Sequence, residues 1–139
     1  MKERANSRRN RLRLTLKRNV QMKFMFIVKS AHPMAPSPKL LEEMHILANR
    51  EIKAGRMLDN GGLMPIAMGA QVRIADGRLT VLDGPFTEAK EVIGGYAVFE
   101  LKDKQEAVAS AVEFMQLHKD HMPGWEGTCE VRAFAPGGP

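Results

Sequence analysis

Three runs of apolar, β-branched and aromatic residues predict the strands that frame the chain. Residues 23–28 form the first run, residues 95–101 the second and residues 129–134 the third. Each run is short and rich in the residue types that fit a pleated, half-buried surface. Apolar side chains occupy consecutive positions in the first two runs, so both faces of these strands require burial.

Two segments with apolar residues at helical spacing lie between these strands. The first starts at Ser37-Pro38, where the serine oxygen can cap amides and proline needs no N–H donor. Gly55 is well placed to end this helix. The predicted buried stripe consists of Leu41, Met44, Ala48 and Ile52. The second helix begins with the capping pattern of Asp103 and Glu106. Its apolar positions are Ala107, Val108, Ala111, Phe114 and Met115.

The region between the two helices has a β pattern over residues 59–86. Residues 63–68 are one candidate strand. Residues 72–74 and 79–81 face each other across Asp76-Gly77, a dipeptide that tolerates the positive φ of tight hairpin turns. A hairpin arm is therefore expected in this region.

The order of elements predicts the fold class. Strand, helix, strands with a hairpin, strand, helix and strand is the order of an α+β protein with the ferredoxin-like split β-α-β plan and an inserted hairpin. Two helices cover only one face of such a sheet. The other face would expose apolar side chains, which favour association. We therefore expect a homodimer that packs sheet against sheet.

Length and charge indicate one folded domain and a basic leader. The chain has 139 residues, of which 44% are hydrophobic and 27% charged, and this fits one globular domain, predicted at residues 22–135. The formal net charge is +5, yet the first twenty residues hold eight basic residues and one acid, which leaves thirteen basic and fifteen acidic residues for the rest. Residues 1–21 are predicted to be disordered and residues 136–139 to be a frayed tail.

Two interpretations of the basic leader stay open. It is either an arm that contacts an acidic partner such as nucleic acid, or sequence upstream of a native start at Met22. We favour the second, because Met22-Lys23-Phe24 is typical of a native beginning. Nucleic acid is not an expected partner outside residues 1–21.

The chain shows no signal for a membrane or for the common cofactor chemistries. Its longest apolar runs, such as residues 24–28, are far shorter than the ~20 residues of a membrane span, and a cytoplasmic location is expected. Cys129, the single cysteine, is interpreted as a packing residue of a strand rather than a reactive thiol. No P-loop, dinucleotide fingerprint, nucleophile elbow or zinc motif is present, and no cofactor is predicted.

One motif resembles a known family. Residues 82–91, Leu-Asp-Gly-Pro-Phe-Thr-Glu-Ala-Lys-Glu, followed by Gly94-Gly95-Tyr96, are similar to the YCII-related family, specifically its DGPF-domain branch. The similarity extends from Met22 to Phe134. The resemblance implies a ferredoxin-like fold that forms a dimeric α/β barrel, with a cleft in each subunit and no established reaction. Genes for such proteins often neighbour extracytoplasmic-function sigma factors, which implies a regulatory setting.

Asp83 is the first candidate site residue, and two roles are open for it. As a structural residue, it would accept hydrogen bonds from loop amides, while Gly84 frees the backbone and Pro85 fixes φ. As a catalytic residue, it would be a carboxylate in the cleft that acts as a general base or orients a histidine. Glu88, in the same loop, is a further candidate ligand-binding residue.

His45 is a candidate catalytic residue that departs from the family pattern. The resemblance implies a histidine and an aspartate on the first helix, but Met44 occupies the histidine position and Lys53 the aspartate position. His45 lies one residue away, which is about 100° of rotation along a helix. The family pair is therefore not carried over.

His118 and His121 complete the candidates, the first as a catalytic and the second as a ligand-binding residue. Their spacing allows both to face one side of a helix. A metal site would need a third ligand, such as Asp83 or Asp120, that the sequence does not bring near. We favour a helix-terminal pair whose positive charge suits the dipole, and no metal is predicted.

Two functions remain, and whether the protein is an enzyme stays open. The first is a small-molecule-binding protein or enzyme with a cleft near Asp83. The alternative is a regulatory dimer whose hairpin arm, around Arg73, Asp76 and Arg78, binds another protein such as a sigma factor.

Overall fold

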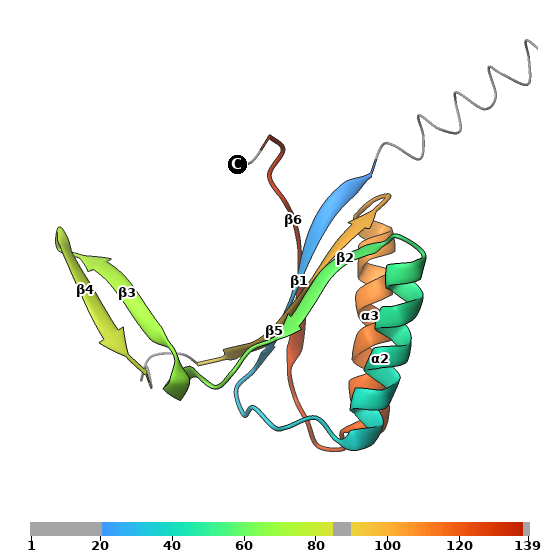
Figure 1. Cartoon of the computed structure of the whole chain (residues 1–139), viewed down its shortest axis with the longest axis horizontal. Helices are drawn as coiled ribbons and strands as arrows, with labels where there is room; N and C mark the ends of the chain where they lie inside the picture. The colour runs from blue at the N-terminus through green and yellow to red at the C-terminus, as the bar shows by residue number, and fades with distance from the viewer. Residues whose placement is uncertain (1–20, 85–89, 138–139) are drawn as a thin grey trace, which may run out of the picture.

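The computed structural model describes residues 21–84 and 90–137, and its centre is a four-stranded antiparallel sheet with the order β2-β5-β1-β6. The two α-helices of this part of the chain both lie on one face of the sheet (Figure 1). The strands of this sheet and the helices are β1 (Met22–Ser30), α2 (Pro38–Lys53), β2 (Met57–Gly62), β5 (Val92–Leu101), α3 (Lys104–His121) and β6 (Thr128–Ala133). Residues 1–20, all but the last residue of the leader predicted at residues 1–21, lie outside the described residues.

The connections follow the split β-α-β pattern. Helix α2 joins β1 to β2, and β5 lies between these two strands; helix α3 joins β5 to β6, and β1 lies between them. This arrangement confirms the prediction of an α+β fold and is consistent with the ferredoxin-like plan. None of the described helices is long and apolar enough to cross a membrane.

The helix ends form as predicted. The Ser37 side chain accepts a hydrogen bond from the Leu40 amide, and Asp103 accepts one from the Glu106 amide. Gly55 follows the last turn of α2 with φ of 76°, a conformation that favours glycine.

The predicted stripe of α2 was wrong at two positions. Leu41 is 41% exposed and Ile52 is 50% exposed, whereas their neighbours Leu40 and Glu51 are buried. At the buried position Glu51 pairs with Arg56: the Arg56 Nε and Nη2 both donate to Glu51 Oε2, and the Arg56 amide donates to the Glu51 carbonyl. An ion pair thus occupies the position where a periodic pattern expects an aliphatic side chain.

The core lies between the sheet and α3. Its buried members come from the two central strands and from two alanines that let the helix approach closely: Phe24, Phe26, Phe99, Leu101, Ala107 and Ala111. The rings of Phe26 and Phe99 stack with centroids 4.6 Å apart. Cys129 packs against this cluster, as predicted, and burial raises the pKa of its thiol to about 11.

The second strand of the sheet lies earlier in the chain than predicted. Residues 63–68 do not form a strand; the strand is β2, and Ile66–Met68 form the short 3₁₀ helix η1. The sequence pattern does not predict β2, because Asp59, Asn60 and two glycines have low β propensity. Its backbone pairs with β5, with an irregularity between Met57 and Asp59.

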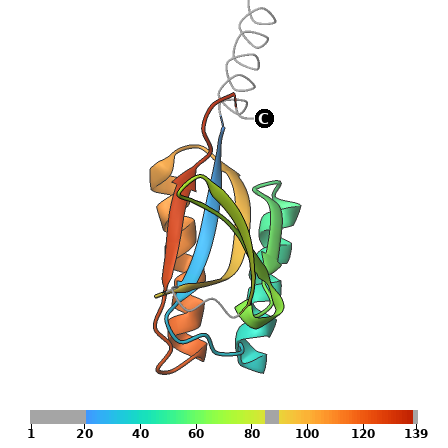
Figure 2. The same ribbon diagram turned by 90° about the vertical axis from the view of Figure 1, so that its left-hand side faces the viewer.

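The predicted hairpin arm is confirmed. Strands β3 (Ala70–Ala75) and β4 (Arg78–Asp83) form a separate two-stranded sheet. Asp76 and Gly77 both have positive φ, 53° and 72°, as a tight hairpin turn requires. Figure 1 shows that the arm stands away from the four-stranded sheet, and in Figure 2 it lies in front of the sheet, on the side opposite the helices.

Candidate ligand site on the open sheet face

The face of the four-stranded sheet that the helices leave uncovered is called here the open sheet face. Phe24 and Phe26 point to the helices, so Met25 and Ile27 point the other way. Strand register builds two cross-strand rows on this face. The first row is Gly61, Tyr96, Ile27 and Glu130, and the second is Asp59, Val98, Met25 and Arg132.

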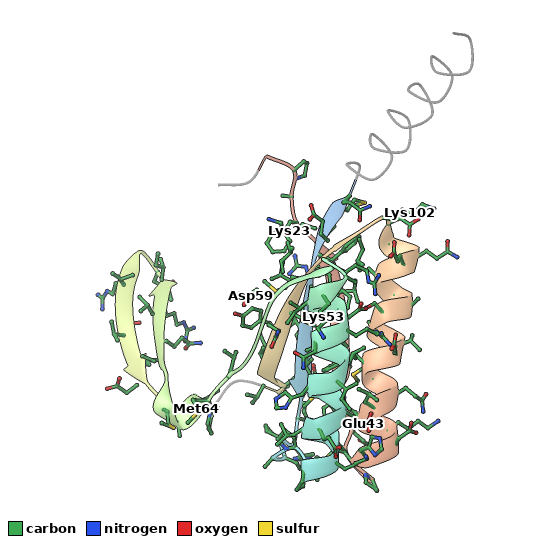
Figure 3. The ribbon with its side chains drawn as sticks, turned by 45° about the vertical axis from the view of Figure 1, so that its right-hand side comes forward. Lys23, Glu43, Lys53, Asp59, Met64 and Lys102 are labelled. Atoms are coloured by element: carbon green, nitrogen blue, oxygen red, sulfur yellow. The ribbon has the colours of Figure 1, made fainter. Side chains whose placement is uncertain are left out.

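Polar groups occupy one edge of the open sheet face. The Tyr96 hydroxyl donates a hydrogen bond to Asp59 Oδ2 at 2.9 Å, and Asp59 lies on the side of the sheet away from the helices (Figure 3). This hydrogen bond and the negative charge of Asp59 raise the pKa of Tyr96, so the phenol keeps its proton. A Cβ at Gly61 would lie 3.0 Å from the Tyr96 ring, which shows why glycine fits beneath it.

Charged groups occupy the other edge. Lys29 Nζ lies 2.6 Å from Glu130 Oε2, and the hydrogen bond from Lys29 lowers the pKa of Glu130. Arg132 Nε lies 4.0 Å from Glu130 Oε1, and the Arg132 side chain is 70% exposed. Glu130 is thus held mainly by Lys29, and the guanidinium of Arg132 is accessible.

A hollow of about 170 Å³ lies at this charged edge. Met25 and Ile27 form an apolar floor, and Arg132 and the apolar residues Ala133 and Phe134 complete the lining. Lys23 Nζ lies 5.8 Å from the centre of the Phe134 ring, within cation–π range. The hollow therefore combines an apolar floor with positive charge, which suits a small organic anion.

A larger hollow, of about 360 Å³, has a structural explanation. It lies where α2 ends, and its lining is Gln21, Ala54, Gly55, Arg56, Glu100 and Glu106. Two of its three charged groups are already engaged, because Arg56 binds Glu51 and Glu106 accepts a hydrogen bond from the Lys102 amide. The Gly55-Arg56 pair therefore serves the junction between α2 and β5.

Asp83 and its loop were the main prediction of the sequence. Asp83 is exposed at the end of β4, opposite Ala70 in the register, and Glu88 lies outside the described residues. The adjacent Gly84 has a clear structural role: its amide donates to the Gly69 carbonyl at 2.9 Å, and a Cβ would lie 1.8 Å from the Ile66 carbonyl oxygen. A catalytic role of Asp83 stays a prediction.

The three candidate histidines lie on helices, on the other side of the four-stranded sheet from the arm that carries Asp83. Helix α3, which carries His118 and His121, lies on the opposite side of the four-stranded sheet from the arm, and so does α2 with the exposed His45 (Figure 1). Within a single chain Asp83 and these histidines are thus on opposite sides of the sheet, and the hypothesis that Asp83 orients a histidine stays a prediction. No group of three or more metal-ligating side chains exists in residues 21–84 and 90–137.

His118 instead belongs to the packing at the end of α3. Its ring lies 4.7 Å from that of Phe114 and 4.8 Å from that of Trp125, and Nδ1 is 3.2 Å from the Phe114 carbonyl oxygen. Burial lowers the pKa of His118, so the neutral imidazole is favoured. The backbone carbonyl of His121 accepts a hydrogen bond from Ser37 Oγ at 2.8 Å, which ties α3 to the start of α2.

Sequence reasoning missed Asp59 and Arg132 as site residues. Asp59 and Tyr96 are 37 positions apart, and only the pairing of β2 with β5 brings them together. A signal existed for Arg132, because it alternates with the packed Cys129 and Val131 on a strand that the sequence predicts. Its direction onto the open sheet face follows from that alternation.

The fold and this face define a small α+β protein with a sheet covered on one side. The chain matches the YCII-related domain over residues 22–115, more than half of its length, and it belongs to that family. It is also similar to an uncharacterised protein of Rhizobium meliloti (strain 1021). The two are 25% identical over 108 residues, which cover 78% of this chain and 83% of that protein.

Proposed function

We propose that this protein is a homodimer of the DGPF-domain branch that binds a small organic anion on its open sheet face. The observation that carries the proposal is the hollow whose floor is Met25 and Ile27 and whose cation is Arg132. An apolar floor with a few convergent polar groups is the usual composition of ligand sites. Arg132 supplies a donor suited to a carboxylate or phosphate.

The size of the hollow supports a second copy as part of the site. Ligand pockets usually have volumes of roughly 300–1,000 Å³, whereas this one has about 170 Å³. Met25, Ile27 and Val98 are only half-buried in a single chain. A second copy that covers the open sheet face would bury these side chains and deepen the hollow.

The test is a ligand screen with two matched variants. Thermal shift with small carboxylates, such as benzoate and octanoate, followed by calorimetry, measures binding to the unaltered protein. We expect a carboxylate to raise the free energy of unfolding, by about 2.7 kcal/mol at one hundred times its dissociation constant. Arg132→Gln should abolish the effect, and Lys53→Gln, which removes a cation on α2, should leave it unchanged. Equal responses of the two variants, or no response to any carboxylate, would refute the anion site.

Asp83 is kept as a candidate anchor of the same site. It lies with the arm on the side of the four-stranded sheet that carries the open sheet face (Figure 1). If Asp83→Asn folds normally and changes neither the thermal shift nor any activity found in a broad substrate screen, Asp83 has no role in binding or catalysis.

A second function is regulatory, with an extracytoplasmic-function sigma factor as the partner. The favouring observation is the position of the turn Asp76-Gly77, with Arg78 beside it, at the tip of an arm that projects from the sheet (Figure 1). The measurement is binding of the purified protein to such a sigma factor. A signal that Asp76→Asn/Arg78→Gln does not weaken would exclude the tip as the contact.

A further inference from the structure

We infer that the hairpin arm is an exchange element: one apolar side of the arm of each copy packs on the open sheet face of the other copy. The inference rests on the homodimer of the proposed function and adds which surfaces meet.

The arm carries all its central aliphatic side chains on one side, called here the arm face. In the register, Val72 lies opposite Val81 and Ile74 lies opposite Leu79. Directly opposed residues of antiparallel strands point to the same side, so these four form one patch. Their exposures are 64% for Val72, 76% for Ile74, 69% for Leu79 and 67% for Val81, which leaves the patch unburied in a single chain.

An unburied arm face is unfavourable for the arm itself. An isolated two-stranded hairpin is at best marginally stable in water and needs a hydrophobic surface to pack against. The other side of the arm is mixed, because Gln71 lies opposite Leu82 and Arg73 opposite Thr80. The arm face is therefore the side that needs a cover.

The chain cannot bring its own arm face onto its own sheet in this structure. The arm is a separate sheet, and its base is fixed where the Gly84 amide binds the Gly69 carbonyl and lies against Ile66. From this base the arm projects away from the four-stranded sheet (Figure 1). In a single chain the arm face and the open sheet face therefore do not pack against each other.

A second copy supplies the matching cover for both surfaces. The open sheet face offers Met25, Ile27 and Val98 in adjacent cross-strand rows, and the arm face offers four aliphatic side chains on paired strands. Apolar β surfaces of this kind pack face to face, about 10 Å apart. A twofold axis makes the exchange reciprocal, so one contact buries both arm faces and both open sheet faces. The partner's arm would then form one wall of the hollow beside Arg132.

The first experiment measures the dimer dissociation constant by sedimentation equilibrium. Val72→Thr/Val81→Thr keeps β-branched residues at a directly opposed pair and places four hydroxyls in the contact of each dimer. We expect the dissociation constant to rise roughly 100-fold or more. Gln71→Thr/Leu82→Thr is the matched control, because it changes an opposed pair on the other side of the arm, and it should leave the constant within about threefold.

The second experiment locates the contact by disulfide formation between differently tagged chains. Ile74→Cys in one chain and Val98→Cys in the other, both with Cys129→Ser, should form an interchain disulfide on oxidation. Thr80→Cys, on the other side of the arm, should not.

The outcomes separate this inference from the proposed function. A dimer that Val72→Thr/Val81→Thr does not weaken, or that crosslinks equally well through Thr80→Cys, overturns arm exchange and leaves the homodimer and its anion site standing. A monomeric unaltered protein overturns both arm exchange and the homodimer. Loss of dimer affinity only in the arm-face variant, with the Ile74→Cys to Val98→Cys disulfide, supports the exchange.

Discussion

The substitution Gly84→Ala tests whether close backbone packing fixes the base of the arm. An added Cβ would lie 1.8 Å from the Ile66 carbonyl oxygen and 2.8 Å from its carbonyl carbon. Both atoms are backbone, so no flexible side chain can move aside, and the chain must shift by more than 1 Å to restore normal contact. Such a shift also breaks the 2.9 Å hydrogen bond from the Gly84 amide to the Gly69 carbonyl.

The magnitude follows from three contributions. Overpacking costs about 1–3 kcal/mol, and the lost hydrogen bond costs about 0.5–1.5 kcal/mol. Alanine restricts the unfolded chain and offsets about 0.4–1 kcal/mol of this. We therefore expect Gly84→Ala to destabilise the base of the arm by about 2 kcal/mol.

The assay combines urea unfolding with hydrogen exchange of the β3 and β4 amides, which detects loosening confined to the arm. Gly94→Ala is the matched control, because a Cβ there meets nothing within 4 Å. The control should change stability by less than about 1 kcal/mol and leave exchange in the arm unchanged. If Gly84→Ala and Gly94→Ala have the same effect in both measurements, the close backbone contact of Gly84 with Ile66 does not fix the base of the arm, and the position of the arm is not fixed either.

Two further predictions concern the helix side of the sheet. Arg56→Met removes the closer of the two cationic partners of the buried Glu51 carboxylate. It should cost about 2 kcal/mol in urea unfolding, below the 3–5 kcal/mol of a fully buried pair, because the Arg56 side chain is 41% exposed and Arg50 Nη2 remains 3.7 Å from Glu51 Oε1. Glu51→Gln/Arg56→Met should recover part of the loss, and no recovery would show that the charge is not the cause. His118 has a pKa below 6.5 in the folded protein, so the unfolded chain takes up its proton first as pH falls through 6.5, and stability should decline until the folded pKa is reached. His118→Gln should flatten this decline in thermal unfolding at pH 7.5 and pH 5, and an unchanged slope would contradict it.

The parts of the fold that the sequence predicts are those with strict local chemistry. Asp76-Gly77 gives the hairpin because few other residues accept two successive positive φ values. Ser37, Gly55 and Asp103 give the helix ends because each cap depends on a side chain within three residues or on one φ angle. Such signals are complete within a few positions of the chain.

The parts that it does not predict depend on long-range pairing. Strand β2 has the sequence of a loop, and it is a strand because β5 offers its edge. The hydrogen bond from Tyr96 to Asp59 depends on that pairing, so neither residue could be recognised as part of a site from the pattern alone. The motif around Asp83 predicts a functional loop, and the structure explains its Gly84 by backbone packing.

The distribution of polar groups gives the reason to look for function on the open sheet face. On the helix side, polar side chains serve the fold: Glu51 holds Arg56, Ser37 and Asp103 cap helices, and His118 packs as a neutral ring. Every buried side-chain nitrogen and oxygen in the described part of the chain has a hydrogen-bond partner. On the open sheet face, by contrast, the exposed guanidinium of Arg132 stands beside half-buried apolar side chains that a single copy does not cover. The fold does not need the Arg132 guanidinium, and a single chain does not cover the apolar side chains beside it. Both are therefore available to a ligand and to a second copy.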